Sequence, residues 1–308
     1  MRFNRILAAI LCIAGLAACE KETRTDVSPE GGETDVITVS MDIPSTRLNL
    51  QMDGYAMKTK WEVGDSLSVV YHQSGNDANN NYYDRYVNDP YYIKKAGDIS
   101  ADGKSAKFSC DNPHFSYGVS NNKVTVTYPY IYKNNSNSSK PEISIDAQFG
   151  GSFENIKPYL LMGAPNIDAG TDGIEGKIAL KPYVSVLKFS AGLRFENIYS
   201  NDKFEVNDVV IRQGYFNYFY LINGYEIQAQ RKGREIVVRP NDAYVENQKL
   251  SKDLYMVVGF DGNPYTPTSK VGAYIVYDGG NSAIFSLKPR TLQPGYVYTI
   301  TAESLYTD

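Results

Sequence analysis

The residue types that most often carry catalysis are sparse in this chain. It has two histidines, His72 and His114, and neither belongs to an HExxH or HxH sequence that could assemble a zinc site. It has no G-x-S-x-G nucleophile elbow and no Gly-rich phosphate loop with its lysine. Its 35 acidic residues form no D-x-D-x-D-G calcium loop, and nothing singles out two of them as a hydrolytic pair. The sequence therefore predicts a protein that is not an enzyme, with no cofactor and no metal.

The clearest chemistry belongs to a cysteine close to the N-terminus. Two arginines precede an apolar stretch over residues 6–16, which is too short to span a bilayer as a mature helix. The stretch ends in Leu-Ala-Ala-Cys at positions 16–19, which resembles the lipobox of bacterial lipoproteins. The resemblance implies a signal peptide over residues 1–19 and a lipid on the thiol of Cys19, holding the protein permanently on a membrane. An ordinary signal peptide with a chance cysteine is the alternative.

Cys110 is then the single thiol of the processed chain, because Cys12 leaves with the signal peptide and Cys19 carries lipid. One thiol can form neither an intramolecular disulfide nor a cysteine metal site. We expect Cys110 to be a small buried apolar residue. The stability of this exported protein must come from its core, and 308 residues suffice for two domains of ordinary size.

The overall charge and the aromatic content narrow the class of partner. A formal net charge of −4, with no Lys/Arg cluster, argues against a surface that binds nucleic acid. Tyrosine is abundant, with 26 Tyr against 12 Phe and a single Trp. Tyrosine suits half-buried strand surfaces and also supplies contact area at binding surfaces, and composition leaves both uses open.

The hydrophobic pattern predicts an all-β protein. Residues 20–35 are polar and read as a flexible tether. From Val36 to Ile43 apolar and polar residues alternate, which is typical of a half-buried strand. Comparable strands are expected at Ser66–Tyr71, Lys123–Tyr128, Val184–Phe189, Val206–Arg212, Tyr215–Ile222, Tyr225–Gln230, Glu235–Arg239, Leu254–Phe260, Ala273–Tyr277, Ala283–Leu287 and Tyr296–Thr301. Turn signals such as Asn223-Gly224 separate them, and no long stretch has helical periodicity.

Many short strands separated by turns favour antiparallel β-sandwiches. The pattern breaks around residues 166–176, where Asn, Asp and Gly gather. We therefore expect two tandem β-sandwich domains, one over residues 36–170 and one over residues 171–308.

Two segments have the composition of insertions. Residues 75–97 are dense in Asn, Asp and Tyr, and residues 133–140 are an Asn/Ser run. The simplest interpretation of both is an exposed loop. For the first, a ligand-binding rim is the alternative, since clustered Tyr and Asn can stack on sugars and hydrogen-bond their hydroxyls. The candidate ligand contacts are Tyr82, Tyr83, Tyr86, Tyr91 and Tyr92.

The sequence W-E-V-G-D-S-L-S-V at residues 61–69 resembles the W-x-x-G-D-x-I-x-V signature of the fimbrillin-like family of Bacteroidales, the subunits of lipoprotein-derived type V pili. Leu67 stands where isoleucine is usual. The lipobox, Y-P-Y at 128–130, L-M-G-A-P at 161–165 and L-Q-P-G-Y-V-Y at 292–298 belong to the same pattern. Apart from any family, we expect Gly64-Asp65 to form a turn before a strand and Trp61 to bury its ring at the edge of the first core.

The resemblance implies two transthyretin-like β-sandwich domains at the outer-membrane surface, assembled with other pilus subunits by donor-strand exchange. In that mechanism a protease removes the first strand, and a strand of another subunit fills the groove. Our candidate cleavage site lies between Arg47 and Leu48, behind the strand Val36–Ile43, so that cleavage would also remove Cys19. The chain ends at Asp308, soon after the strand Tyr296–Thr301, which leads us to expect a tip or anchor subunit contributing to adhesion to a surface glycan or protein.

A glycan-binding surface lipoprotein of a polysaccharide uptake system is the competing hypothesis. It shares the lipobox, the β-sandwiches and the surface tyrosines. It differs in predicting an exposed aromatic platform and a first strand that stays in place.

The lipobox generates the first testable prediction. Cys19→Ala removes the thiol that accepts the lipid, so membrane retention should be lost while the folded body stays intact. Labelled fatty acid fed to the cells should enter the wild type and the Cys12→Ala control but not Cys19→Ala. Equal labelling of Cys19→Ala and wild type would contradict the assignment.

Overall fold

The computed structural model describes residues 35–41, 60–76, 79–111, 113, 122–130, 142–170, 173–174, 176–195, 203–212, 215–222, 226–230, 235–267, 271–277, 281–287, 291–300 and 305–306. Over these residues the chain is nearly all β, as predicted, with one short α-helix, α1 (Phe153–Ile156), and two 3-10 turns, η1 (Ala96–Asp98) and η2 (Lys157–Tyr159). Within the described part, no helix has the length and hydropathy needed to cross a bilayer. Cys19, Arg47, Leu48 and the run 133–140 lie outside the described residues.

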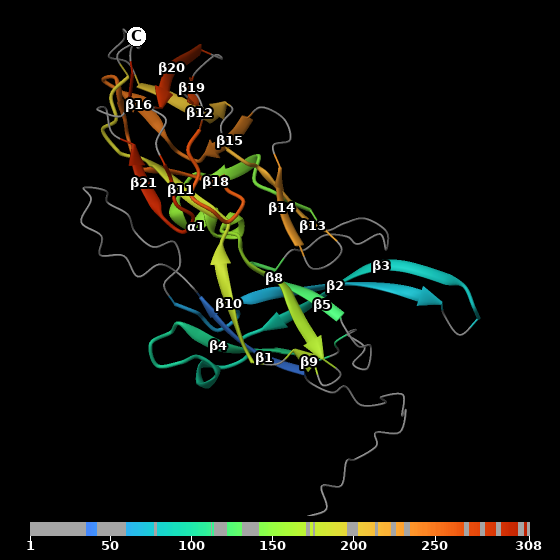
Figure 1. Ribbon diagram of the computed structural model, residues 1–308. Coiled ribbons are helices and arrows are strands. Elements are labelled where there is room, and N and C mark those ends of the chain that lie inside the picture. Colours follow the sequence, from blue (N-terminus) through green and yellow to red (C-terminus); the bar gives the residue numbers. More distant parts are fainter. Residues whose placement is uncertain are drawn as a thin grey trace, which may run out of the picture.

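The first half of the chain forms one eight-stranded sheet with the strand order β10-β1-β4-β3-β2-β5-β8-β9 (Figure 1). The strands are β1 (Asp35–Met41), β2 (Ser66–Asn76), β3 (Tyr82–Tyr92), β4 (Ser105–Cys110), β5 (Asn122–Tyr128), β8 (Met162–Gly170), β9 (Gly173–Ile174) and β10 (Lys177–Pro182). Because β10 also pairs with β8, the pairing closes on itself around a single apolar core. Closure leaves few open edges, which is how antiparallel folds avoid unwanted pairing.

The second half forms two sheets that share another core, which makes it a β-sandwich. One sheet is β18 (Leu254–Gly259), β11 (Val184–Phe189) and β21 (Val297–Ile300). The facing sheet contains β12 (Lys203–Arg212), β15 (Glu235–Pro240), β16 (Tyr244–Glu246), β17 (Lys249–Leu250), β19 (Val271–Tyr277), β20 (Asn281–Leu287) and β22 (Leu305–Tyr306). Side chains such as Phe189, Met256 and Ile211 fill the space between the sheets.

The two halves do not separate at the break that the sequence pattern suggests. Residues 166–176 lie largely in β8 and β9 of the first sheet, and the chain leaves this sheet after Pro182. The break in pattern has a local cause, because Asn166 and Gly176 adopt positive φ, at 59° and 83°. Residues of this type mark turns and irregularities within a sheet as readily as they mark linkers.

A segment from the first half is also built into the second. β7 (Ala147–Gly150) pairs in parallel with β15, and β6 (Glu142–Ser144) pairs with β13 (Tyr218–Ile222), which itself pairs with β14 (Glu226–Gln230). The chain therefore crosses to the second half at residue 142, returns through β8 and β10, and crosses again. Figure 1 shows β8 and β10 leading between the two parts.

An apolar interface joins the outer face of the first sheet to the second half. Val70 of β2 belongs to the same buried cluster as Leu161, Tyr183 and Ile227. The approach is closest at Gly163, where a Cβ atom would lie 2.4 Å from Cδ1 of Ile227. A side chain at that position would therefore require the Ile227 side chain to shift.

Gln148 fixes the crossing segment in the second half. Its side chain is fully buried, and its Nε2 donates to the carbonyl oxygens of Ile145 and Val257 at 2.9 and 2.8 Å. The Val257 N–H donates in return to Oε1 of Gln148 at 2.8 Å. One amide side chain thus satisfies the backbone of β18 at this point, where water cannot reach.

Gln148→Leu keeps the side-chain size but leaves the C=O of Ile145 and the N–H and C=O of Val257 without these partners. We expect it to lower the free energy of unfolding by about 3–5 kcal/mol, the cost of three unsatisfied buried groups. Urea denaturation followed by circular dichroism measures the change. The exposed Gln228→Leu serves as control and should stay within about 0.5 kcal/mol of wild type. An equal effect of both substitutions would contradict this role.

Candidate functional site

The slot of the first strand is the candidate site. β1 runs antiparallel to β4 from Asp35 opposite Cys110 to Ser40 opposite Ser105. On its other edge it runs parallel to β10, from Thr38 beside Lys177 to Met41 beside Leu180. β1 is therefore hydrogen-bonded on both edges, although it is the first described strand of the chain.

The two neighbours of β1 have little other pairing over this stretch. Among the described residues, β4 pairs with β3 at Tyr92 and Ser109 and forms one isolated bridge, between Ala106 and Ile99. The pairing of β10 to β8 begins beyond β1, at Lys181 and Pro182. Most of the backbone ladder that holds β4 and β10 in the sheet is therefore supplied by β1.

The inward face of β1 belongs to the core of the first sheet. Ile37, Val39 and Met41 are buried against residues such as Phe108 and Leu180, whereas Val36 is 49% exposed. The predicted alternation of the strand is confirmed over Asp35–Met41. Removing this strand would open an apolar groove and expose backbone groups on both of its sides.

A hydrogen bond from a buried tyrosine to the half-buried Asp35 closes the N-terminal end of the slot. The hydroxyl of Tyr91 on β3 donates to Oδ2 of Asp35 at 2.6 Å, and the Tyr91 side chain is 1% exposed. The pairing of Tyr92 with Ser109, extended by one residue, places Tyr91 opposite Cys110, which is itself opposite Asp35. Cys110 of β4 therefore lies between Asp35 of β1 and Tyr91 of β3 across the sheet, and its small side chain is buried, as predicted.

The tryptophan motif anchors the start of β2 beside this core. Trp61 is 3% exposed, and its ring meets Phe108 of β4 and Tyr128 of β5 edge-on, with centroid distances of 5.0 and 5.2 Å. Such T-shaped pairs add to the stability gained by burial alone. The prediction that Trp61 buries its ring at the edge of the first core is confirmed.

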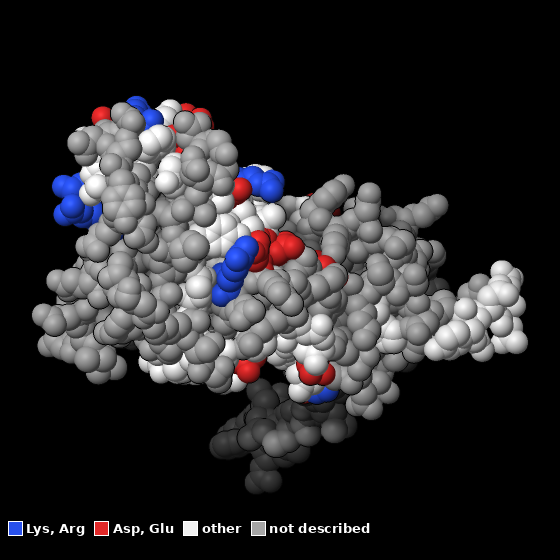
Figure 2. Space-filling view, turned by 90° about the horizontal axis from the view of Figure 1, so that it is seen from above, with Lys and Arg blue, Asp and Glu red and all other residues white. Residues whose placement is uncertain are grey.

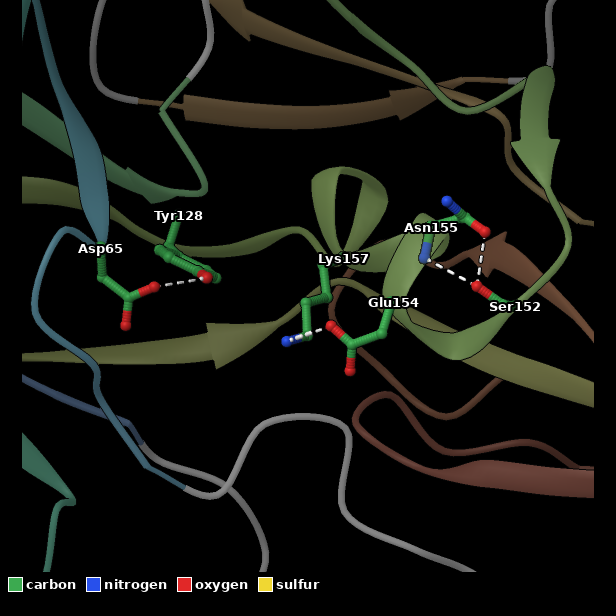
Figure 3. A network of polar contacts seen from close by, with 6 residues as sticks. All are labelled: Asp65, Tyr128, Ser152, Glu154, Asn155 and Lys157. Atoms are coloured by element: carbon green, nitrogen blue, oxygen red, sulfur yellow. Dashed lines mark hydrogen bonds and ion pairs between the residues drawn. The ribbon is translucent and has the colours of Figure 1, made fainter.

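The Gly-Asp pair of the motif has a precise local role. Gly64 adopts φ of +91°, which a residue with a side chain would take only under strain. Asp65 accepts the N–H of Glu62 at 2.7 Å. It also accepts the hydroxyl of Tyr128 at 3.0 Å (Figure 3). Burial, with a further contribution from the charge of Asp65, raises the pKa of Tyr128 well above its ordinary value, so the neutral phenol donates at physiological pH.

Figure 3 also shows α1 beside this motif. Ser152 caps the helix by accepting the N–H of Asn155 at 3.3 Å, and Lys157 pairs with Glu154 at 2.6 Å. The bond to Glu154 raises the pKa of Lys157, and the charges of Glu62 and Asp65 add to this effect. The contacts of Asp65 with Glu62 and Tyr128 belong to turn formation and packing, so the motif has a structural role in this part of the fold.

The Tyr-rich segment is a hairpin and not a loop. β2 and β3 pair over their whole lengths, from Ser66 opposite Tyr92 to Asn76 opposite Tyr82, whereas the pairing of β2 to β5 ends at Tyr71. Tyrosine and valine are strong strand formers, and this preference outweighs the Asn and Asp content of the segment. Figure 2 shows the end of the hairpin projecting from the body, and the described residues at its tip, 76 and 79–82, are uncharged.

The five candidate tyrosines do not form one surface. Tyr82 is 70% exposed and Tyr92 is 42% exposed, whereas Tyr86 is half-buried with its ring 4.9 Å from that of His72. Tyr91 points into the core, so its interpretation as a ligand contact is wrong. The side chain of Tyr83 lies outside the described part. In the part of the chain that the structure describes, no three metal-ligating side chains gather.

Comparison with known proteins finds likeness among solved structures. No family model and no curated protein matches the chain. A candidate cell adhesion protein from Bacteroides uniformis is 13% identical, with 88% of this chain and 96% of that chain covered and a TM-score of 0.44. Another from Parabacteroides distasonis is 14% identical, covers 90% and 91%, and has a TM-score of 0.40. The tip fimbrial protein Mfa3 from Porphyromonas gingivalis is 9% identical, covers 87% and 94%, and has a TM-score of 0.34.

Trp61→Ala should lower the free energy of unfolding by about 3–5 kcal/mol, the range for deleting a large buried aromatic. The native fluorescence of Trp61, the single tryptophan, should accordingly be that of a buried indole. Val63→Ala, in the same turn at an exposed position, is the matched control and should change stability by less than about 0.5 kcal/mol. A water-exposed emission spectrum in the native protein would contradict the packing.

Proposed function

We propose that this chain is a fimbrial subunit of the fimbrillin-like type that assembles through exchange of its first strand. The observation that carries the proposal is the position of β1, which is paired on both edges and buries Ile37, Val39 and Met41. A strand in this position is needed by the fold, yet it is joined to the body through residues 42–59, which contain Arg47.

Cleavage after Arg47 would turn β1 from a covalent part of the chain into a separate segment. Its departure would leave β4 and β10 with unpaired backbone groups facing each other across an apolar groove. Open edges of this kind recruit another extended strand, because only a strand restores both the ladder and the buried side chains. In this proposal the replacement comes from another pilus subunit.

The same cut would release the protein from its lipid. Cys19 and β1 both precede Arg47, so one cleavage removes the membrane anchor and opens the groove. A chain that stays uncleaved remains attached to the outer membrane as an anchor, and a cleaved chain enters the fimbria as a tip subunit. The projecting β2–β3 hairpin, with Tyr82 and Tyr92 exposed, is our candidate for adhesive contact with a surface glycan or protein.

A glycan-binding lipoprotein of a polysaccharide uptake system is the second candidate. The exposure of Tyr82 and Tyr92 on one face of the hairpin favours it, since exposed aromatic rings stack on sugars. This alternative needs no cleavage, and the protein would keep β1 and its lipid throughout. Fractionation separates the two, with the protein in sheared pili in one case and retained in membranes in the other.

A trypsin-like protease should cut the folded precursor after Arg47, and N-terminal sequencing of the large fragment should begin at Leu48. Arg47→Ala should leave a folded, lipidated monomer that does not enter pili, because β1 stays attached. Arg47→Lys, which keeps a basic residue for such a protease, is the matched control and should assemble. The proposal fails if Arg47→Ala assembles as well as wild type.

A further inference from the structure

The hydrogen bond between Tyr91 and Asp35 joins β3 to the first residue of β1, a strand whose apolar pattern fits more than one register. We propose that this bond sets the register of the strand in the slot, and that a strand entering from another subunit must carry a hydrogen-bond acceptor at the position of Asp35. The requirement on the incoming strand rests on the strand exchange proposed above, whereas the role of the bond in setting the register concerns this chain by itself.

The hydrophobic pattern of β1 leaves its register ambiguous. A slip by one residue reverses the two faces of a strand, but a slip by two residues keeps every side chain on its face. The alternation in the sequence continues to Ile43, so a slip by two would place Ile37, Val39, Met41 and Ile43 where Asp35, Ile37, Val39 and Met41 lie now. Three inward positions would stay apolar, and the backbone ladder would be the same.

The one inward position that changes in this slip is the first. Ile37 would meet the hydroxyl of Tyr91, which would exchange a carboxylate acceptor at 2.6 Å for an alkyl chain. Because Tyr91 is buried, water is poorly placed to replace the lost acceptor. The hydroxyl of Ser40, which donates to the Ile178 carbonyl at 3.2 Å, would also lose its position. Both bonds are partly buried, but Ser40 is itself half-buried, so water can reach its hydroxyl more easily than that of Tyr91, which is 1% exposed.

Asp35 also opposes a slip in the other direction. Moving β1 two residues the opposite way would carry Asp35 into the place of Ile37, which is 2% exposed in the core. A carboxylate there would be buried among apolar side chains, at high cost. Asp35 therefore opposes both slips, but only the slip that brings Ile37 to the place of Asp35 is opposed through Tyr91. Removing the Tyr91 hydroxyl should therefore permit that slip and not the reverse one.

Paired cysteines on the outward face report the register. Thr38 lies opposite Lys107 in the native pairing, so Thr38→Cys with Lys107→Cys should form a disulfide. A slip that brings Ile37 opposite Cys110 would bring Ser40 opposite Lys107, and the reverse slip would bring Val36 there. The three pairs are compared in the full-length chain with Cys110→Ala, and the linked peptides are identified by mass spectrometry.

Tyr91→Phe removes only the hydroxyl and should raise the ratio of the 40–107 to the 38–107 disulfide by about 10-fold, while the 36–107 disulfide stays at its baseline. Asp35→Asn keeps an acceptor and should retain the native register. Tyr71→Phe is the matched control, because Tyr71 is another buried tyrosine whose hydroxyl donates to Asp89 at 3.1 Å. An unchanged ratio in Tyr91→Phe, or an equal change in Tyr71→Phe, would overturn the proposal that this hydrogen bond sets the register of β1.

The incoming strand is tested on protein cleaved after Arg47. The probes are acetylated peptides with the β1 sequence Asp-Val-Ile-Thr-Val-Ser-Met and with Asn or Ala as the first residue. The Asp and Asn peptides should bind about 10-fold more tightly than the Ala peptide, and Tyr91→Phe should remove the difference. If the three peptides bind the wild type equally, only the acceptor requirement is overturned. If none of the three peptides binds, the strand exchange itself is contradicted.

Discussion

The pairing of β1 with β4 and β10 is the interaction on which the first half of the molecule depends. Apart from β1, β4 pairs with β3 at Ser109 and forms one isolated bridge from Ala106 to Ile99, and β10 meets β8 only at its last two residues. Most of the backbone pairing of both strands therefore comes from β1. An ordinary edge strand can leave a sheet at modest cost. A strand with two paired edges and an apolar inner face leaves two open edges and an apolar groove when it departs, so its loss costs much more unless another strand takes its place.

The elements around the slot keep its walls in position. Trp61 packs on Phe108 of β4, and Asp65 binds the hydroxyl of Tyr128 on β5, so the start of β2 is tied to both sides of the core. The crossing segment with Gln148 joins the first sheet to the sandwich behind it. The contacts of Trp61 and Asp65 hold β4 and β5 in place through groups other than β1 itself.

The sequence pattern predicted those features that depend on the residue itself and its neighbours in the chain. The alternation from Val36 to Met41, the burial of Trp61 and the buried state of Cys110 could all be inferred, because period and side-chain chemistry decide them. The crossing of residues 142–150 to the second half could not be predicted, since the partner of β7 is ninety residues away in the sequence and short strands carry little pattern. The inward orientation of Tyr91 was missed because the density of tyrosines suggested a surface, whereas strand alternation places it on the face opposite to Tyr82 and Tyr92.

Hydrogen exchange at the backbone amides of β4 and β10 tests the central claim most directly. The amides are compared in the intact chain, in the chain from which β1 has been released, and after a replacement strand is added. If β1 supplies most of the backbone pairing of both strands, their amides should lose protection when β1 is released and regain it when the new strand binds. The amides of β11 and β18, in the second half, should stay protected throughout. Full protection of β4 and β10 after release of β1 would contradict the account.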